Sequence, residues 1–132
     1  MPTSTADLLA VVRAARSLGA REHIVLGMGE FGTVTRILQR RLGNLLTFAS
    51  SPGAAAAPGH LDPRTLAELY RTPAHHGATR LFAVIGNPIA HSKSPEYHNG
   101  RFIEDGIDAT YVPVLVDDVA AFFELAEELG IL

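Results

Sequence analysis

Apolar runs of strand length alternate with helix-forming segments along this chain. Four runs are short and rich in branched residues, which is typical of buried strands: residues 23–28 (HIVLGM), 45–49 (LLTFA), 81–85 (LFAVI) and 109–116 (ATYVPVLV). Helical patterns precede, separate and follow them, in the order α-β-α-β-α and then β-α-β-α. Because alternating strands and helices form parallel sheets that helices cover, the sequence predicts an α/β fold.

Five segments carry the spacing and the end signals of helices, namely residues 3–18, 31–42, 62–70, 94–106 and 118–130. Gly19 follows the first as a helix stop. Asp62, Ser94 and Asp118 stand where a side chain can cap a helix N-terminus. The last helix is predicted to have one apolar face, which consists of Val119, Phe122, Phe123, Ala126 and Leu129.

The stretch of residues 72–80 (TPAHHGATR) divides the chain into two modules. Residues 1–72 carry eight Lys and Arg against five Asp and Glu, whereas residues 73–132 carry three against nine, so the charge changes from +3 to −6. We therefore predict a first domain over residues 1–71, a linker over 72–80 and a second domain over 81–132.

The composition excludes several classes of function. The 132 residues contain no cysteine, which excludes disulfides and thiolate chemistry. No apolar run reaches the roughly 18 residues of a membrane span, and the N-terminus lacks a signal-peptide pattern, so we expect a cytoplasmic protein without a membrane partner. Neither half has a basic stripe with interleaved aromatic residues, so no nucleic acid partner is expected. The histidines show no metal-ligand spacing.

A glycine-rich turn at Gly27–Gly32 (GMGEFG) matches the pattern G-x-G-x-x-G. It lies between a predicted strand and a predicted helix, as in dinucleotide sites, where glycines let backbone N–H groups approach a pyrophosphate. Such sites have an acidic residue about 20 positions later that binds the ribose. Here the next carboxylate after Glu30 is Asp62. A small nucleotide-binding module is therefore a weaker alternative, in which Arg40 or Arg41 would contact an NADP phosphate.

The same turn is part of a longer resemblance. MGEFGTVTR at residues 28–36, LLTFAS at 45–50 and AAPGHL at 56–61 resemble the closing segment of type I 3-dehydroquinate dehydratases. The resemblance covers residues 1–70. It implies the C-terminal portion of a (β/α)8 barrel, in which the two strands predicted here would be the seventh and the eighth. Active sites of such barrels lie at the C-terminal ends of the strands.

This first resemblance implies substrate-binding residues. The family has an arginine at the position of Arg36 that binds the substrate carboxylate, which suits the planar fork of a guanidinium. In the family's mobile loop, Ala56 and His60 replace a serine and a glutamine; His60 can donate a hydrogen bond to the substrate, whereas Ala56 cannot. The family also uses a Schiff-base lysine, but the only lysine of the chain is Lys93, beyond the linker. We therefore predict no catalytic residue in this chain.

A second motif lies after the linker. VIGNPIAHSKSPEYHN at residues 84–99, continued by GIDATYVPVLVDD at 106–118, resembles the start of shikimate dehydrogenases. The resemblance implies the start of their α/β substrate-binding domain over residues 81–132. Ser92 and Ser94 match the two family serines that bind the shikimate carboxylate. A loop-to-helix junction suits an anion, because it presents free N–H groups and the positive end of the helix dipole.

The order of the two segments is that of the bifunctional enzymes of the shikimate pathway. The resemblance implies a parent that dehydrates 3-dehydroquinate and reduces the product, 3-dehydroshikimate, to shikimate with NADPH. Its NADP domain and its dehydrogenase catalytic residues would lie beyond residue 132, so this chain is expected to bind no cofactor and no metal. The alternative is a non-catalytic binding or interaction fragment. Two barrel strands with open edges would favour a homo-oligomer.

Overall fold

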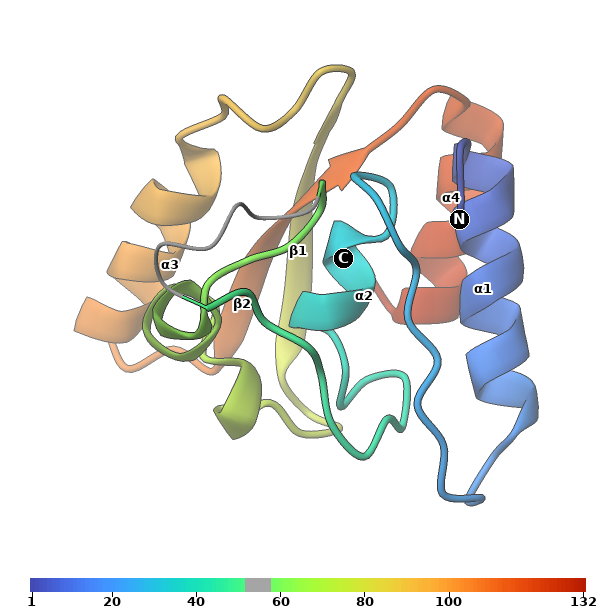
Figure 1. Cartoon of the computed structure of the whole chain (residues 1–132). Coiled ribbons are helices and arrows are strands. Elements are labelled where there is room, and N and C mark those ends of the chain that lie inside the picture. Colours follow the sequence, from blue (N-terminus) through green and yellow to red (C-terminus); the bar gives the residue numbers. More distant parts are fainter. Residues whose placement is uncertain (52–57) are drawn as a thin grey trace.

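The computed structural model describes residues 1–51 and 58–132, and Figure 1 shows its elements. They follow in the order α1 Thr5–Ser17, α2 Thr33–Ile37, η1 Thr65–Leu69, η2 Thr72–Ala74, β1 Arg80–Gly86, α3 Ser94–Glu104, β2 Ala109–Leu115 and α4 Val119–Leu129. η1 is a π-helix and η2 is a 3-10 helix. The predicted α/β class is confirmed. No helix within the described ranges is long and apolar enough to cross a membrane.

β1 and β2 form a parallel pair, and α3 is the crossover between them. The register places Leu81 opposite Thr110. The end of the chain lies along the other side of β1, where the N–H of Leu132 donates to the carbonyl of Leu81 (2.8 Å). The buried Asn99 holds α3 against β2, because its side-chain amide donates to the carbonyl of Tyr111 and accepts from its N–H, both at 2.8 Å. The two strands predicted in the second half are thus confirmed.

The first and last helices lie side by side and close one core that both halves share (Figure 1). Leu8 and Val12 of α1 and Leu125 and Leu129 of α4 are at most 2% exposed, and they belong to one buried cluster with Ile37 of α2. Burial of a large aliphatic side chain contributes roughly 1.5–3 kcal/mol. The shared core is therefore the main source of stability at the contact between α1 and α4.

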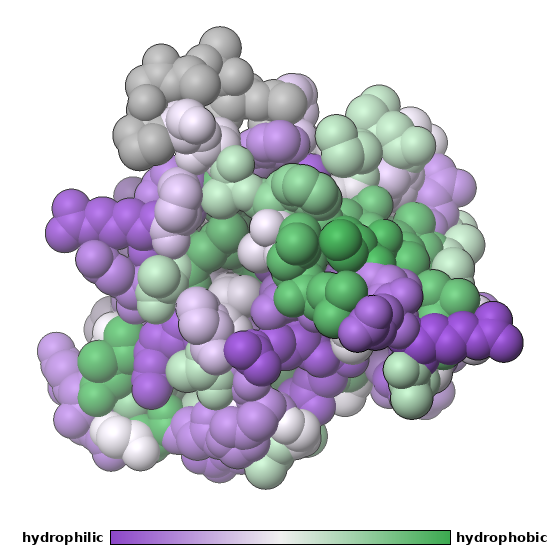
Figure 2. Space-filling model, turned by 60° about the horizontal axis from the view of Figure 1, so that its bottom comes forward, coloured by the Kyte–Doolittle hydropathy of each residue, from purple (hydrophilic) through white to green (hydrophobic). Residues whose placement is uncertain are grey.

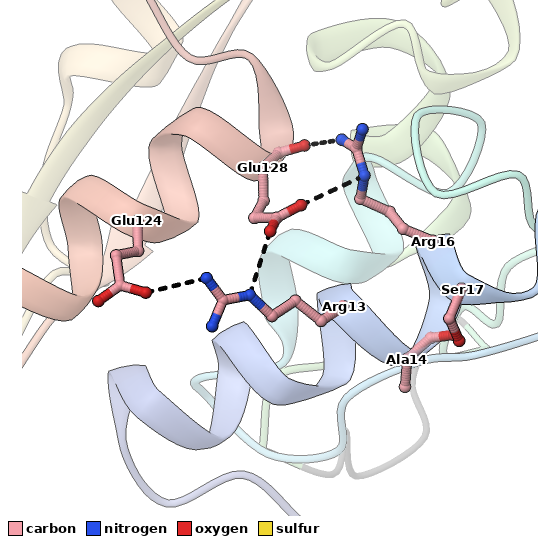
Figure 3. Close-up of polar contacts among 6 residues, drawn as sticks. All are labelled: Arg13, Ala14, Arg16, Ser17, Glu124 and Glu128. Carbon is pink, nitrogen blue, oxygen red and sulfur yellow. Dashed lines mark hydrogen bonds and ion pairs between the residues drawn. The ribbon is translucent and has the colours of Figure 1, made fainter.

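Ion pairs line the solvent side of this contact (Figure 3). Arg13 Nη2 lies 2.9 Å from Glu124 Oε2, and Arg13 Nε lies 3.1 Å from Glu128 Oε1. Arg16 Nε lies 3.3 Å from Glu128 Oε2, and Arg16 Nη1 donates to the carbonyl of Glu128. Because both arginine side chains are half exposed, water screens these pairs, and they contribute little to stability.

The two strands predicted in the first half are wrong. Residues 23–28 and 45–49 form irregular backbone, with one isolated bridge between His23 and Asn44. The side-chain amide of Asn44 accepts from the N–H of Val25 (2.7 Å) and donates to its carbonyl (2.9 Å). A strand needs a row of neighbouring backbone groups, whereas the partners found here are mainly side chains, such as Asn44 and Thr35, whose hydroxyl accepts from the N–H of Gly27 (2.9 Å). The barrel portion of the predicted fold is therefore not confirmed.

Large apolar side chains of these two segments remain exposed. Ile24, Leu45, Leu46 and Phe48 are 43%, 61%, 44% and 55% exposed. Figure 2 shows apolar surface that extends from the centre to the right of the face drawn, with a smaller area at the lower left. In a sheet with both faces covered, such side chains would be buried. Apolar surface of this kind favours association with another surface.

The second predicted helix is shorter than expected. α2 ends at Ile37, and residues 38–43 continue as turns instead of helix. Gly43 has a φ of 72°, in the left-handed region that favours glycine, and the N–H of Asn44 donates to the carbonyl of Gln39 (2.9 Å). The apolar spacing over residues 31–42 thus indicated correctly that the segment is largely buried, but the segment is not a continuous helix.

The apolar face predicted for the last helix is partly wrong. Phe122 and Leu129 are buried, but Val119 and Phe123 are 55% and 65% exposed, and Leu125 is buried instead. The covered stripe of α4 is the one that packs against α1.

The predicted caps have mixed outcomes. Asp118 caps α4, since its carboxylate accepts from the N–H groups of Ala120 and Ala121. Asp62 accepts from the N–H of Thr65 (2.9 Å) at the start of η1. Ser94, in contrast, is the first residue of α3, and Lys93 occupies the N-cap position without a side-chain cap.

Residues 72–80, predicted as a linker, pack between the two halves. Thr72, His75 and Thr79 are 3%, 8% and 5% exposed. The hydroxyl of Thr72 donates to the carbonyl of Ile37 (3.1 Å), and the hydroxyl of Thr79 donates to Oδ1 of Asp108 (3.0 Å). The segment is thus hydrogen-bonded to both halves.

Candidate functional site

A cavity of about 380 Å³ lies where the two halves meet, and we call it the seam cavity. Its first wall consists of Glu30, Thr33, residues 59–61 and η1 with Tyr70; its second wall consists of the loop after β1, the first turn of α3 and the end of β2. This second wall lies at the carboxyl ends of two parallel strands, where α/β folds bind ligands. The seam cavity is therefore one candidate site.

Two of the four predicted substrate-binding residues line the seam cavity, one from each half. Nε2 of His60 is buried and has no hydrogen-bond partner among the described residues. The hydroxyl oxygen of Ser92 accepts from the N–H of Ser94 at 3.4 Å, a long hydrogen bond. Both side chains thus retain unused hydrogen-bonding capacity. Ala56, whose effect on the loop was also predicted, lies outside the described residues.

Ser94 begins α3 and is not part of the cavity wall. The first turn of this helix presents N–H groups and the positive end of its dipole next to Ser92. Lys93 and Glu96 flank the turn, and Lys93 Nζ lies 3.3 Å from Glu96 Oε1. The junction therefore combines two hydroxyls, backbone donors and one nearby ammonium group.

Tyr70 forms part of the cavity wall, although no sequence signal pointed to it. It is 5% exposed, and burial raises the pKa of its phenol to about 12, with the Glu96 carboxylate acting in the same direction. The phenol is therefore neutral over the whole physiological range. Its backbone carbonyl lies 2.7 Å from Nε2 of His75, and burial lowers the pKa of this histidine. The phenol hydroxyl has no hydrogen-bond partner among the described residues.

Arg36 lies away from the seam cavity and is almost completely buried, with 1% of its surface exposed. Nη1 donates to the carbonyl of Gly27 (2.7 Å), Nη2 lies 3.4 Å from Sδ of Met28, and Nε has no partner in the described part of the chain. Burial lowers the pKa of the guanidinium. The side chain of Met28 is half exposed and contacts this group. Met28 is thus a flexible and half-exposed neighbour of the buried guanidinium.

The glycine-rich turn packs on its own backbone. A methyl group on Gly32 would collide with the carbonyl of Gly27, and one on Gly59 would collide with the carbonyl of Gly29. The strand expected before the turn is missing, and α2 after it has five residues. These glycines allow one backbone segment to pack closely against another, which leaves no room for a pyrophosphate at the turn. The described residues therefore do not fit a dinucleotide. No group of three or more potential metal ligands occurs in residues 1–51 and 58–132.

Both halves of the chain match known protein families. Residues 1–76, more than half of the chain, match the model of the type I 3-dehydroquinase family. The chain belongs to this family. Residues 84–132 match the shikimate dehydrogenase substrate binding domain. The type I 3-dehydroquinase segment therefore continues directly into a shikimate dehydrogenase segment, and the predicted junction of the two enzymes is confirmed.

Curated relatives contain the same junction. The chain is 32% identical over 125 residues to the bifunctional 3-dehydroquinate dehydratase/shikimate dehydrogenase, chloroplastic, of Arabidopsis thaliana, with 92% of this chain and 21% of that protein covered. It is 31% identical over 121 residues to the pentafunctional AROM polypeptide of Yarrowia lipolytica, with 92% and 8% covered. This type I 3-dehydroquinase family member thus spans about a fifth or less of these relatives.

Two further matches are to a single enzyme and to a solved structure. The 3-dehydroquinate dehydratase of Methanococcus vannielii is 52% identical over 46 residues, with 35% of this chain and 21% of that protein covered. The solved dehydroquinate dehydratase and shikimate dehydrogenase from S. pombe AroM is 27% identical, with a TM-score of 0.40, and covers 95% of this chain and 24% of that one.

Proposed function

We propose that this chain is part of a shikimate-pathway enzyme that dehydrates 3-dehydroquinate to 3-dehydroshikimate and reduces this product to shikimate with NADPH. The observation that carries the proposal is the presence of both family matches in one chain, over residues 1–76 and then 84–132. A chain that joins the two enzymes brings consecutive steps of one pathway together.

We propose Arg36 as the group that binds the substrate carboxylate in the dehydratase half. Its guanidinium is buried with an unused Nε donor, and no described acidic side chain pairs with it. An unpaired buried charge is costly, and a carboxylate would compensate it through charge-assisted hydrogen bonds. Met28, which covers the guanidinium, would have to move aside.

We propose Ser92 and Ser94 as the carboxylate-binding pair of the dehydrogenase half. They flank the start of α3, where helix N–H groups and Lys93 add positive potential. His60 is proposed as a further hydrogen-bond donor to the substrate, because its buried Nε2 has no partner in the described residues.

These 132 residues are proposed to bind without turnover. An imine mechanism needs an amine nucleophile next to the bound ketone, and the only lysine, Lys93, is exposed and paired with Glu96. NADP would supply the hydride for the reduction, and the described residues do not fit it, since the glycine turn at Gly27 is filled by its own backbone.

Calorimetry with 3-dehydroshikimate on the 132-residue chain tests this proposal. We expect saturable binding that Arg36→Met weakens about tenfold or more, since a hydrogen bond to a charged group contributes about 1.5–3 kcal/mol. Arg64→Met is the matched control, because the Arg64 side chain is 82% exposed. We also expect no dehydration of 3-dehydroquinate and no oxidation of NADPH. Turnover that disappears in Arg36→Met would contradict binding without catalysis.

A further inference from the structure

We propose that Asn99, in the middle of α3, is a positioning residue for the substrate carboxylate of the dehydrogenase half. Its side chain holds α3 in the orientation that directs Ser92, Ser94 and the free N–H groups of the first helical turn at the anion, without touching the substrate itself. This inference rests on the proposed carboxylate site and names the residue that fixes the geometry of that site.

The hydrogen bonds that join α3 to another element in the described part of the chain are both made by Asn99. Nδ2 donates to the carbonyl of Tyr111 on β2, and Oδ1 accepts from the N–H of the same residue, both at 2.8 Å. The other hydrogen bonds and ion pairs described for residues 94–104 stay within the helix or reach its flanking residues. Loss of the Asn99 amide would therefore remove the hydrogen bonding between α3 and the sheet.

Few side chains of α3 are buried. Of its 11 residues, Pro95 and Asn99 are the buried ones, and Asn99 is 2% exposed. Tyr97 and Ile103, which are large and apolar enough to anchor a helix, are instead 67% and 46% exposed. Pro95 lies at the start of the helix, in the wall of the seam cavity. Asn99 is thus the buried contact that holds the middle of the helix.

Tyr111 gives this contact a firm base on β2. Val116, just after β2, donates its N–H to the carbonyl of Gly86 at the end of β1 (3.1 Å). Because the backbone groups of successive strand residues face opposite edges, those of Tyr111 face the edge away from β1 and are open to Asn99. The ring of His98 stacks on the ring of Tyr111, with centroids 4.4 Å apart. Two successive residues of α3 thus hold one residue of β2, which restricts both the position and the rotation of the helix.

The orientation of α3 sets the geometry of the carboxylate site. Asn99 follows Ser94 at a distance of about 7.5 Å along the helix axis, since each residue adds about 1.5 Å. A tilt of the helix at Asn99 would move Ser94 and turn the N–H groups of the first turn. Ser92 would lose its place as well, because its hydroxyl accepts from the N–H of Ser94 (3.4 Å). A misplacement of about 1 Å can cost about a hundredfold in rate, so Asn99 should control how well the carboxylate binds.

Kinetics of 3-dehydroshikimate reduction by the complete natural protein that contains these residues test the proposal. Asn99→Ala is expected to raise KM about tenfold and to leave kcat within about twofold, because a carboxylate contact stabilises the bound substrate and the transition state alike. The dehydration of 3-dehydroquinate should stay unchanged. A purely structural role would lower the amount of active protein, and hence the apparent kcat, without a change in KM.

Asn44→Ala is the matched control. Asn44 is 6% exposed and makes the same pair of hydrogen bonds with the backbone of Val25 in the dehydratase half. Its loss should destabilise the protein to a similar degree, because it also leaves a backbone donor and acceptor without partners. It should leave KM for 3-dehydroshikimate unchanged. An unchanged KM in folded Asn99→Ala, or an equal rise in both variants, would overturn the proposal.

Two further variants separate the possible failures. Ser92→Ala should raise the same KM; if it does and Asn99→Ala does not, the positioning role is wrong and the carboxylate site stands. If Ser92→Ala has no effect, the carboxylate site is wrong, and the positioning role with it. If Asn99→Ala does not fold, Asn99→Asp takes its place, since it has the same size and keeps the bond from the Tyr111 N–H. KM should rise here too because the donor to the carbonyl is lost, and an unchanged KM would again overturn the proposal.

Discussion

Thr5 at the start of α1 and Asp117 before α4 bind each other through both backbone and side chain. The Thr5 hydroxyl and N–H donate to Asp117 Oδ1 at 2.6 and 2.8 Å, and the N–H of Asp117 donates back to the Thr5 hydroxyl at 3.0 Å. The two residues are 112 positions apart. This contact fixes the beginning of the dehydratase segment against the dehydrogenase segment.

This contact should make stability depend on pH. Hydrogen bonds from Thr5 lower the pKa of Asp117 below its ordinary value of 3.8. A carboxyl group with a lowered folded-state pKa stabilises the fold above that ordinary value, and the contribution is lost as the pH falls through the lowered pKa. We expect Asp117→Asn to unfold at a lower temperature at pH 7 and to show a weaker further loss of stability below about pH 4. Thermal unfolding followed by circular dichroism over a pH series measures both. Parallel curves for the two proteins would show that Asp117 contributes nothing.

The shared core should make the two halves unfold together. Leu125 is fully buried against α1, so Leu125→Ala is expected to cost about 2–5 kcal/mol. Phe123→Ala, two positions earlier on the same helix, is the control, because Phe123 is 65% exposed and its loss should cost within about 0.5 kcal/mol. Urea unfolding measures these values. The amides of α1 and α4 should lose protection in one transition, and separate transitions would disprove a common core.

Local signals in the sequence predicted α1, α3, α4 and the second-half strands. Asp118 caps α4, and the apolar stripe of α1 with Leu8 and Val12 is buried as its spacing indicates. β1 and β2 form because they pair with each other in parallel. Residues 23–28 and 45–49 have equally apolar sequences, but in this structure the amide of Asn44 and a single bridge replace the missing strands. A strand forms only beside another strand, and the local sequence does not show whether such a neighbour is present.

The candidate sites were predictable only where the family motifs cover them. Arg36, His60, Ser92 and Ser94 were named from the motifs, but only His60 and Ser92 meet at one cavity. Tyr70 lies outside the quoted motifs, at the end of η1, and forms part of the cavity wall. Such long-range packing leaves no periodic trace in the sequence.

The exposed apolar segments should cause self-association. Leu45 and Phe48 are 61% and 55% exposed on the first half. Sedimentation velocity at increasing concentration is expected to show a dimer or a larger species, and Leu45→Ser with Phe48→Ser should shift it toward monomer. Phe123→Ser, which removes an equally exposed aromatic side chain from α4, should leave the distribution unchanged. A monomer at every concentration would refute this expectation.

One polypeptide is proposed to carry two separate carboxylate-binding half-sites of consecutive enzymes. Kinetics of the complete natural protein that contains these residues tests it most directly. Arg36→Met should lower kcat/KM for 3-dehydroquinate about tenfold or more and leave the reduction of 3-dehydroshikimate unchanged. Ser92→Ala with Ser94→Ala should lower kcat/KM for the reduction of 3-dehydroshikimate and leave the dehydration of 3-dehydroquinate unchanged. Ser17→Ala, which alters an exposed serine on α1, should change neither activity. If each change lowers both activities equally in folded protein, or if neither activity responds, the account of two half-sites is contradicted.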